Sequence, residues 1–327
     1  MSDHFHPCPW LANGHLQTWA GSILPRAKQN TRLEQLYLAD GDFLELHWLD
    51  AAKLDAPLLI LLHGLEGSVN SSYIQGMLKI AREHQWRAVV PHLRGSGGRM
   101  NMLPEAYHAG KTEDFDIVLQ YIRSLYPNVF CASVGFSLGA NVLLKYLGEQ
   151  SSQHYIHTAI GVSVPFDLKA SVMYMNKFYN KMFVRHLKKS TMEKIKNNMQ
   201  MPVNALELAQ IKTLYDFDDK ITAPLHGFLN AEDYYQKSSC IHFLKNIQTP
   251  TLIIHAKDDP MIPKNVIPSK AQVSDKVILD IQEHGGHVGF IRCEKFNKIQ
   301  CWVEERVLAY LNKTCYTRVN NCALFNI

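Results

Sequence analysis

Residues 133–146 read SVGFSLGANVLLKY, and a β-prone segment meets a helical one at GFSLG, residues 135–139. The apolar residues after this turn recur at helical spacing. A serine on a sharp strand-to-helix turn projects from the sheet, and the flanking glycines let other backbone pass close by. A serine hydroxyl needs such positioning to act as a nucleophile. The pattern therefore predicts a nucleophilic Ser137; the alternative interpretation is a tight turn with a structural serine.

A nucleophilic serine needs a basic partner, and the base needs an acid that orients it. On a turn of this kind the order along the chain is serine, acid, histidine. The expected strand Thr251–His255 is followed by two carboxylates, Asp258 and Asp259. Asp259, which directly precedes Pro260, is the predicted acid. Asp258 stays as the alternative, and a cap or turn role is expected for whichever of the two is not catalytic.

The base is expected after one further strand, at residues 277–281. The loop that follows reads HGGHVGF over residues 284–290. A glycine-rich loop can carry an imidazole back over the sheet, so His287 is the predicted base for Ser137. His284 is the alternative. The chain has sixteen histidines, and most of them must have other roles.

Acyl chemistry at a serine also needs hydrogen-bond donors for the oxyanion. One expected donor is the backbone N–H of Leu138, directly after the nucleophile. The second should come from the loop after the apolar strand Leu58–Leu62, which reads HGLEGS over residues 63–68. The N–H of Leu65 is the predicted donor in that loop. His63 is expected to brace the loop rather than to take part in catalysis.

The rest of the chain alternates short apolar β-prone segments with helical ones, which is the pattern of an α/β fold with a mostly parallel sheet. Residues 43–48 are expected to form one arm of an early hairpin. The final helix is expected over about 294–311, followed by an irregular tail over 312–327. The stretch 165–235 has no convincing strand and reads as a helical insertion. The predicted organisation is one discontinuous core, 1–164 and 236–327, with a helical lid over 165–235.

The expected lid carries an unusual concentration of positive charge. Residues 166–200 hold eight basic and two acidic residues, so their formal charge of +6 exceeds the +4 of the whole chain. Six apolar residues fall at helical spacing beside these lysines: Val172, Met175, Phe178, Tyr179, Met182 and Phe183. This pattern is compatible with an acyl chain below and a transient contact with a membrane surface above. The alternative is a lid helix that packs on the core and leaves its lysines in solvent.

Composition bounds the class of protein. The 327 residues are 46% hydrophobic and 20% charged, which is typical of a globular protein and not of a disordered one. The net charge of +4 is too small to indicate a nucleic-acid partner. No secretory signal, apolar run long enough for a bilayer or close-spaced metal-ligand motif is recognised.

Seven widely spaced cysteines without a CxxC pair predict free thiols and a cytoplasmic location, with a Cys315–Cys322 bridge as the alternative in the tail.

One glycine-rich segment, RGSGG at residues 94–98, superficially resembles a phosphate-binding loop. It matches neither the dinucleotide-binding nor the P-loop pattern. It is interpreted as a glycine turn whose Arg94 is paired inside the protein.

These motifs together resemble the α/β-hydrolase superfamily, and within it the YheT-like esterases. The resemblance covers most of the chain. Its segments are PW at 9–10, NGHLQT at 13–18, HGLEGS at 63–68, RGSG at 94–97, YHAG at 107–110, GFSLGANVLLKYLGE at 135–149, residues 255–260 and residues 284–290. It implies the α/β-hydrolase fold and hydrolysis of esters or related acyl compounds, without a metal or organic cofactor, but it does not settle the substrate. The expected substrate is a small-molecule carboxylic ester with a short or medium apolar acyl group or a lipid-like one.

Some members of this family carry an N-terminal membrane anchor, which is not recognised in this chain. No obligate protein partner is evident. Two further functions stay open. The same triad could serve a thioesterase or an acyltransferase, and a non-catalytic binding protein can be built on a hydrolase fold.

Overall fold

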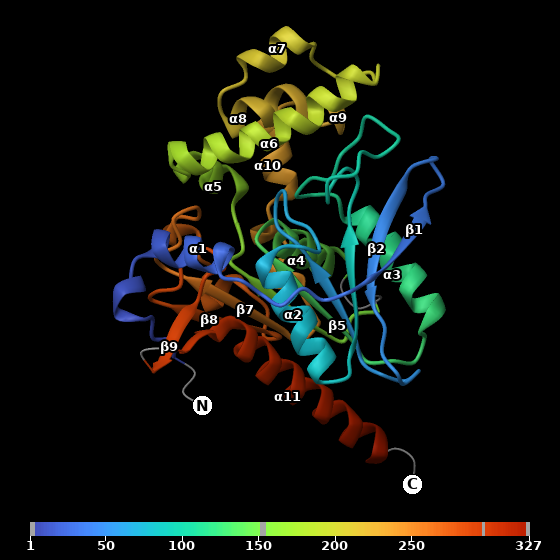
Figure 1. Cartoon of the computed structure of the whole chain (residues 1–327), viewed down its shortest axis with the longest axis vertical. Helices are drawn as coiled ribbons and strands as arrows, with labels where there is room; N and C mark the ends of the chain where they lie inside the picture. The colour runs from blue at the N-terminus through green and yellow to red at the C-terminus, as the bar shows by residue number, and fades with distance from the viewer. Residues whose placement is uncertain (1–3, 151–154, 296–297, 325–327) are drawn as a thin grey trace.

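The central sheet has eight strands in the order β1-β2-β4-β3-β5-β6-β7-β8 (Figure 1). The computed structural model describes residues 4–150, 155–295 and 298–324. The strands are β1 Arg32–Tyr37, β2 Phe43–Leu49, β3 Leu58–Leu62, β4 Arg87–His92, β5 Cys131–Phe136, β6 Thr158–Val162, β7 Thr251–Ala256 and β8 Val277–Gln282. Strand β2 pairs antiparallel with β1 and β4, and the pairs from β4 to β8 are parallel. The predicted early hairpin and mostly parallel sheet are confirmed.

Strand β3 shows how the two faces of the sheet are covered. All five of its residues are buried, as expected of a central parallel strand. Leu58, Ile60 and Leu62 pack in one apolar cluster with α3 and α4, whereas Leu59 and Leu61 pack in another with α2 and α11. Full burial of each such side chain contributes about 1.5–3 kcal/mol. The helices of this core are α1 Gly14–Ile23, α2 Ser72–Glu83, α3 Thr112–Leu125, α4 Leu138–Gln150 and α11 Trp302–Leu324.

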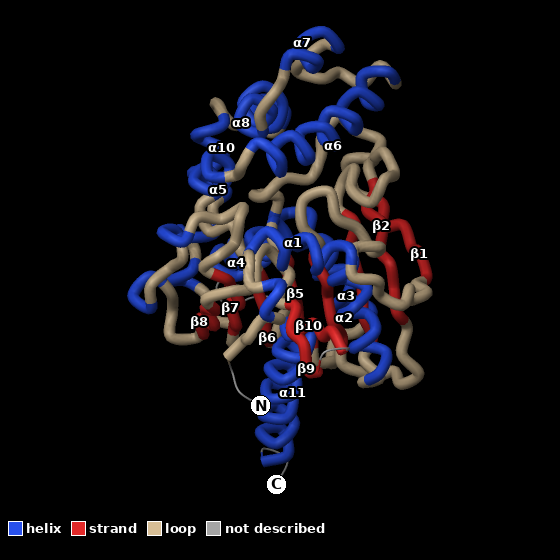
Figure 2. The backbone as a smooth tube through the Cα atoms, turned by 60° about the vertical axis from the view of Figure 1, so that its left-hand side comes forward, coloured by secondary structure: helices blue, strands red, loops and turns tan. Residues whose placement is uncertain are grey.

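The helices between β6 and β7 gather at one end of the molecule, opposite the end where α11 finishes (Figure 2). They are α5 Leu168–Tyr174, α6 Lys177–Lys196, α7 Ala205–Gln210, α8 Leu214–Phe217, α9 Ala223–Leu225 and α10 Ala231–Ser238, with a π-helical turn over Asp218–Thr222. They share a small apolar cluster of their own that includes Val184, Leu208 and Phe217. These helices lie in the expected insertion; the division into a core and a lid at 165 and 235 stays a prediction. Short 3-10 helices cover Pro9–Leu11, Cys240–His242, Leu244–Asn246, Lys264–Val266 and Lys270–Gln272.

The C-terminal part of the chain differs from expectation. Residues expected to start the final helix instead form two antiparallel strands, β9 Ile291–Lys295 and β10 Lys298–Cys301. The helix begins only at Trp302 and continues to Leu324, through most of the tail that was expected to be irregular. No glycine or proline occurs after residue 289, so nothing in the local sequence ends the helix at Leu311. Among the described residues no helix has the length and apolarity that crossing a membrane requires.

The prediction of free thiols is wrong for two of the seven cysteines. Cys8 and Cys293 form a disulfide between the N-terminal segment and β9, with their Cα atoms 5.1 Å apart. The two are 285 residues apart in the sequence, so no spacing motif could have indicated the pair. Cys131, Cys240 and Cys301 are buried free thiols, and Cys315 is also free. The side chain of Cys322, the alternative partner of Cys315, lies outside the described part of the structure.

Candidate active site

Ser137 occupies the turn between the last residue of β5 and the first residue of α4. Its backbone is left-handed, with φ 51°, and its N–H donates to the carbonyl of Val162 at 2.9 Å. The flanking glycines are sterically required here. A Cβ on Gly135 would lie 2.6 Å from the Cα of Ala140, and one on Gly139 would lie 2.5 Å from the carbonyl oxygen of His63. The turn thus presents the Ser137 side chain above the ends of the parallel strands.

Three side chains from different loops meet at this point. Nε2 of His287 lies 2.8 Å from Oγ of Ser137, and Nδ1 of the same ring lies 2.8 Å from Oδ2 of Asp259. His287 comes from the loop after β8, and Asp259 follows β7. The other oxygen of Asp259 accepts hydrogen bonds from the N–H groups of Met261 and Ile262, at 2.8 and 3.2 Å. The structure therefore brings together the serine, histidine and acid that the sequence singled out.

The environment of Asp259 favours its charged form. Burial alone would raise the pKa of this carboxyl, but the charge and the hydrogen bond of His287 outweigh that effect, so its pKa lies below the ordinary value. An ionised carboxylate at this place can hold the His287 ring in one orientation and stabilise its protonated form.

The two alternative residues, Asp258 and His284, form a separate pair. Nδ1 of His284 lies 3.3 Å from Oδ2 of Asp258, and the His284 side chain is 47% exposed. The other oxygen of Asp258 accepts a hydrogen bond from the N–H of Gly286 at 2.8 Å. This pair is not hydrogen-bonded to Ser137. From the loop after β7, Asp258 therefore stabilises the backbone turn of the loop that carries His287.

Two tyrosines hold the loop that contains Leu65. The hydroxyl oxygen of Tyr73 accepts from the N–H of Gly64 at 3.0 Å, and that of Tyr107 accepts from the N–H of Glu66 at 2.6 Å. Glu66 has the left-handed φ of 56° that this bond supports. Leu65 and Leu138 line one pocket together with Ser137. Within the described residues, neither of their N–H groups has a protein acceptor, so both are available to an oxyanion.

His63 has the bracing position expected of it. Its ring nitrogens lie 2.8 Å from the carbonyl oxygen of Gly64 and 3.2 Å from Oγ of Ser96. The side chain is buried, and that burial lowers its pKa, so the ring is neutral near pH 7. His63 therefore supports the loop through its contact with the loop backbone. It is not hydrogen-bonded to Ser137.

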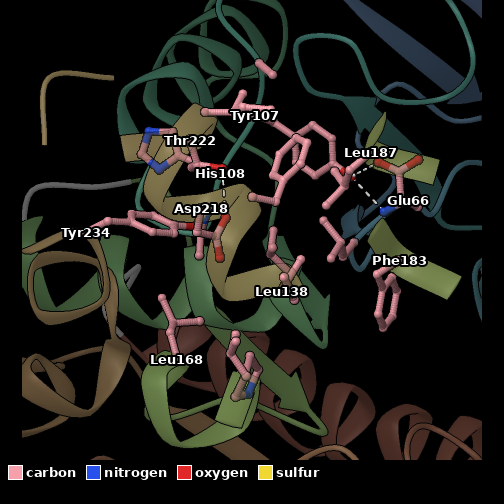
Figure 3. Close-up of a pocket in the computed structure, with 18 of the residues that line it drawn as sticks. Glu66, Tyr107, His108, Leu138, Leu168, Phe183, Leu187, Asp218, Thr222 and Tyr234 are labelled. Carbon is pink, nitrogen blue, oxygen red and sulfur yellow. Dashed lines mark hydrogen bonds between the residues drawn. The ribbon is translucent and has the colours of Figure 1, made fainter. Parts of the chain in front are cut away.

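The pocket that contains Ser137 is mainly apolar, and residues of the helices between β6 and β7 line much of it. Phe183, Leu187 and Tyr234 are three of these and are labelled in Figure 3. Its apolar lining includes Leu168, Val172, Met175, Phe183, Leu187, Phe217 and Ile221. Of the six residues in the expected apolar stripe, Val172, Met175 and Phe183 line the pocket, whereas Phe178 is 53% exposed. The stripe is divided because α5 ends at Tyr174 and α6 starts after its N-cap, Asn176.

A polar group lies on the other side of Leu138 from Phe183 and Leu187 (Figure 3). Oδ2 of Asp218 accepts a hydrogen bond from the hydroxyl of Tyr235 at 2.7 Å, and Oδ1 accepts from that of Thr222 at 2.8 Å. Burial raises the pKa of Asp218 to about 6, although the two hydroxyls partly oppose the shift. The sequence analysis did not find this residue, because an isolated aspartate in a helical segment carries no recognisable signal.

Not all of the predicted lid lysines lie at the surface. Lys194 is buried, and its ammonium donates to the carbonyls of Leu103, Pro104 and Glu105 at 2.7–3.1 Å. Desolvation lowers the pKa of Lys194 to about 8. This residue joins α6 to a loop of the core and is not available to a membrane.

The RGSGG segment is held by internal ion pairs. Arg94 is buried, and its guanidinium contacts the carboxylates of Asp40, Asp42 and Asp114 at 2.6–3.3 Å. Asp42 and Asp114 are buried with the arginine, whereas Asp40 contacts it from the surface. The interpretation as a glycine turn with a paired arginine is therefore confirmed.

A second cluster, Glu45, His47 and His92, has the composition of a metal site. Nε2 of His92 accepts a hydrogen bond from the N–H of Val69 at 2.8 Å, so the single proton of the neutral ring lies on Nδ1. Gly97 packs against that same nitrogen, because a Cβ built on it would lie 2.0 Å away. A protonated, sterically covered Nδ1 cannot coordinate a cation, so His92 does not fit the role of a ligand.

A model of the alpha/beta hydrolase fold matches residues 57–292 of this chain. The chain is 36% identical to YheT of Escherichia coli, whose own description as an esterase is provisional, over 98% of this chain and 96% of that protein. It is 30% identical to phospholipase ABHD3 of Mus musculus, over 94% of this chain and 77% of that one. It is also 32% identical to a monoacylglycerol lipase of Saccharomyces cerevisiae, over 72% of this chain and 55% of that one.

Solved structures show the same fold at low sequence identity. The esterase Pf2001 of Pyrococcus furiosus superposes with a TM-score of 0.56 at 16% identity, covering 88% of this chain and 96% of that one. At this identity the similarity extends to the fold alone.

Proposed function

Because this chain belongs to the α/β-hydrolase family, we propose that it is a serine carboxylesterase in which Ser137, His287 and Asp259 form the catalytic triad. The observation that carries the proposal is the continuous chain of two 2.8 Å contacts from Asp259 through His287 to Ser137 at an apolar pocket. The names of the relatives, which include a phospholipase and a monoacylglycerol lipase, support an ester with an apolar acyl group.

The proposed reaction has two acyl-transfer steps. Oγ of Ser137 attacks the ester carbonyl carbon while Nε2 of His287 takes the hydroxyl proton. The N–H groups of Leu65 and Leu138 stabilise the oxyanion of the tetrahedral intermediate. The intermediate collapses to an acyl-Ser137, and His287 returns the proton to the departing alkoxide. Water, deprotonated by His287, then attacks the acyl carbon. The second tetrahedral intermediate collapses to the carboxylic acid, and His287 returns the proton to Oγ of Ser137.

The apolar part of the pocket suits the acyl chain. Phe183 and Leu187 of α6 lie on one side of Leu138, where they can cover a hydrocarbon chain (Figure 3). Burial of each additional methylene there would contribute about 0.8 kcal/mol. This supports a preference for medium-length or lipid-like acyl groups over acetate.

The test is labelling with a fluorophosphonate, which reacts covalently with an activated serine. We expect labelling of the native protein and none of Ser137→Ala. Ser190→Ala is the matched control, because Ser190 lines the same pocket but its hydroxyl, among the described residues, is hydrogen-bonded only to the backbone carbonyl of His186, at 3.5 Å. Labelling of Ser137→Ala, or of neither folded protein, would contradict the proposal and favour a binding protein.

A second assay identifies the leaving group of the substrate and the acceptor of the acyl group. Hydrolysis rates of p-nitrophenyl esters and of matched thioesters, with acyl chains of increasing length, separate an esterase from a thioesterase. Product analysis in the presence of an alcohol detects an acyltransferase. An esterase should prefer the oxygen ester and release free acid with water as acceptor.

We also propose transient contact between the segment 166–200 and an anionic membrane surface. Met173, Tyr174 and Phe178 are 52–66% exposed at the start of this segment. Trp19 of α1, 49% exposed, contacts Phe178 with the ring centroids 5.5 Å apart, so the apolar surface continues onto α1. Lys177, Lys181 and Arg185 follow on α6 and have no acidic partner within the described residues. Exposed apolar groups beside unpaired cations are suited to an anionic interface.

Sedimentation with vesicles tests this contact. Native protein should bind vesicles that contain phosphatidylserine better than vesicles of phosphatidylcholine alone. Reversal of Lys177, Lys181 and Arg185 to Glu should abolish the difference. Reversal of Lys28, Lys53 and Lys245, which are exposed and also have no acidic partner among the described residues, is the matched control with the same change of charge. Equal binding by both triple variants would refute the proposed surface.

A further inference from the structure

The NGHLQT segment at residues 13–18 takes no part in the proposed reaction, yet it lies against the loop that carries His287. It forms the start of α1, whose N-cap Asn13 accepts from the N–H groups of His15 and Leu16. Figure 1 shows α1, in blue, beside the C-terminal part of the chain, in orange and red. Within α1, only Gly14, Gln17 and Thr18 are buried.

Thr18 holds the backbone of His287 itself. Its hydroxyl donates to the carbonyl of Gly14 at 2.7 Å, which occupies its only proton. A lone pair of the same oxygen therefore accepts the N–H of His287, at 2.8 Å. Because the Thr18 hydroxyl donates its proton to Gly14, its orientation is fixed, and so is the direction of its lone pairs. The hydrogen bond from the His287 N–H therefore constrains where the His287 backbone lies.

Gln17 holds the other end of the same loop. Its carboxamide oxygen accepts from the N–H of Ile291 at 2.7 Å, and its Nε2 donates to the carbonyl of Ile291 at 3.0 Å. The second proton on Nε2 goes to the carbonyl of Leu11 at 2.8 Å. Gln17 has no exposed surface, so all of its polar groups are satisfied inside the protein. The side-chain amide of Gln17 thus bonds both the N–H and the carbonyl of Ile291, as a neighbouring β-strand would.

Between these two anchors the loop is strained. Val288 and Phe290 have φ values of 60° and 47°, in the left-handed region that β-branched and aromatic residues rarely adopt. Such conformations persist only where the surroundings impose them. Close packing adds to that constraint, because a Cβ on Gly289 would lie 2.3 Å from the carbonyl oxygen of Gln17.

We propose that Gln17 and Thr18 are positioning residues that hold the His287 loop in its strained conformation and so aim Nε2 of His287 at Ser137. The predicted effect on kcat rests on the proposed function, whereas the predicted effect on the conformation of the His287 loop does not. A displacement of about 1 Å at a reacting group can cost about a hundredfold in rate. The predicted loss is therefore in kcat, because neither residue lines the substrate pocket.

The test uses four variants on the same helix. Thr18→Val keeps the shape but loses the acceptor for the His287 N–H, and we expect kcat to fall about tenfold to a hundredfold with little change in KM. Thr18→Ser restores the hydroxyl and should regain most of the native rate. Ser22→Ala is the matched control, since the Ser22 hydroxyl bonds the carbonyl of Trp19 at 2.8 Å and does not touch the loop. Gln17→Glu, which cannot donate to Ile291, should resemble Thr18→Val.

A readout without substrate separates this inference from the proposed function. Hydrogen exchange, followed by mass spectrometry, should show faster exchange over residues 284–291 in Thr18→Val and native exchange in Thr18→Ser and Ser22→Ala. Native protection and native kcat in Thr18→Val would overturn the inference. An equal loss of rate in Thr18→Val and Thr18→Ser would also overturn it. Faster exchange in a protein whose residual activity does not depend on Ser137 would uphold the loop anchor and refute the proposed triad.

Discussion

The carboxylate of Asp259 lies 2.8 Å from Nδ1 of His287 and is buried. Its neighbour in the sequence, Asp258, instead accepts the N–H of Gly286, one residue before the same histidine. The two adjacent acids therefore hold one loop in different ways: Asp259 contacts the imidazole, and Asp258 contacts the backbone. This difference makes their functional roles separable by mutation.

Substitution of the two acids by Asn should have very different effects. Asp259→Asn keeps the shape but removes the charge that stabilises protonated His287, and we expect kcat to fall about 10⁴-fold. Asp258→Asn retains an acceptor for the Gly286 N–H, so kcat should stay within about tenfold of native. Steady-state kinetics with a p-nitrophenyl ester measures both. A larger loss in Asp258→Asn would move the catalytic role to Asp258 and His284.

Tyr107 should affect the rate through the oxyanion loop. Tyr107→Phe removes the acceptor for the N–H of Glu66, a residue that itself has a positive φ of 56°. We expect kcat to fall about fivefold, which corresponds to one hydrogen bond of about 1 kcal/mol. Tyr37→Phe, at an exposed tyrosine in β1, is the control. Native kcat in Tyr107→Phe would show that the loop does not need this bond.

Asp218 should make the stability of the protein depend on pH. Its folded-state pKa of about 6 lies above the ordinary value for aspartate, so folding favours the protonated form. The corresponding stabilisation is complete below about pH 4 and is lost as the pH rises through about 6; the difference is about 3 kcal/mol. In Asp218→Asn this dependence should be absent.

Urea unfolding at pH 4 to 7 measures the effect. The difference in unfolding free energy between native protein and Asp218→Asn should fall over that range, because only the native protein must deprotonate Asp218. A difference that is constant with pH would mean that Asp218 keeps an ordinary pKa in the folded state.

The acyl pocket should be shortened by a larger side chain at Leu187. Leu187→Trp places an indole in the apolar part of the pocket (Figure 3), so the preferred acyl chain should become shorter. kcat/KM for the longest esters should fall about 10- to 200-fold while that for short esters changes little. Leu206→Trp, at a position on α7 that is 78% exposed, is the matched control. An unchanged chain-length profile in Leu187→Trp would place the acyl chain elsewhere.

Short local patterns made the core of this site recognisable without a structure. The turn at Ser137 requires glycines on both sides because backbone passes within van der Waals distance of them, so GFSLG is visible as a motif. The acid and the histidine follow strands of strongly apolar character. The C-terminal hairpin was not predictable in this way, because residues 291–301 are as compatible with a helix as with strands.

Pairings between distant segments carry no such signal. Thr18 and His287 are 269 residues apart, Gln17 and Ile291 are 274 apart, and Cys8 and Cys293 are 285 apart. The motif at 13–18 was recognisable, but its role was not, because a buried glutamine or threonine on a helix is compatible with many partners. Asp218 was equally invisible, since its hydroxyl partners come from a π-helical turn and from α10.

The fold class, the order of the strands along the chain and the three residues of the candidate triad therefore follow from local sequence, because strand propensity, turn sterics and helical periodicity act over a few residues. The aim of His287, the anchoring of its loop by α1 and the disulfide to β9 depend on tertiary packing. Such contacts form only when the sheet brings the two ends of the chain together, and hydrogen bonds between segments so far apart have no counterpart in local sequence.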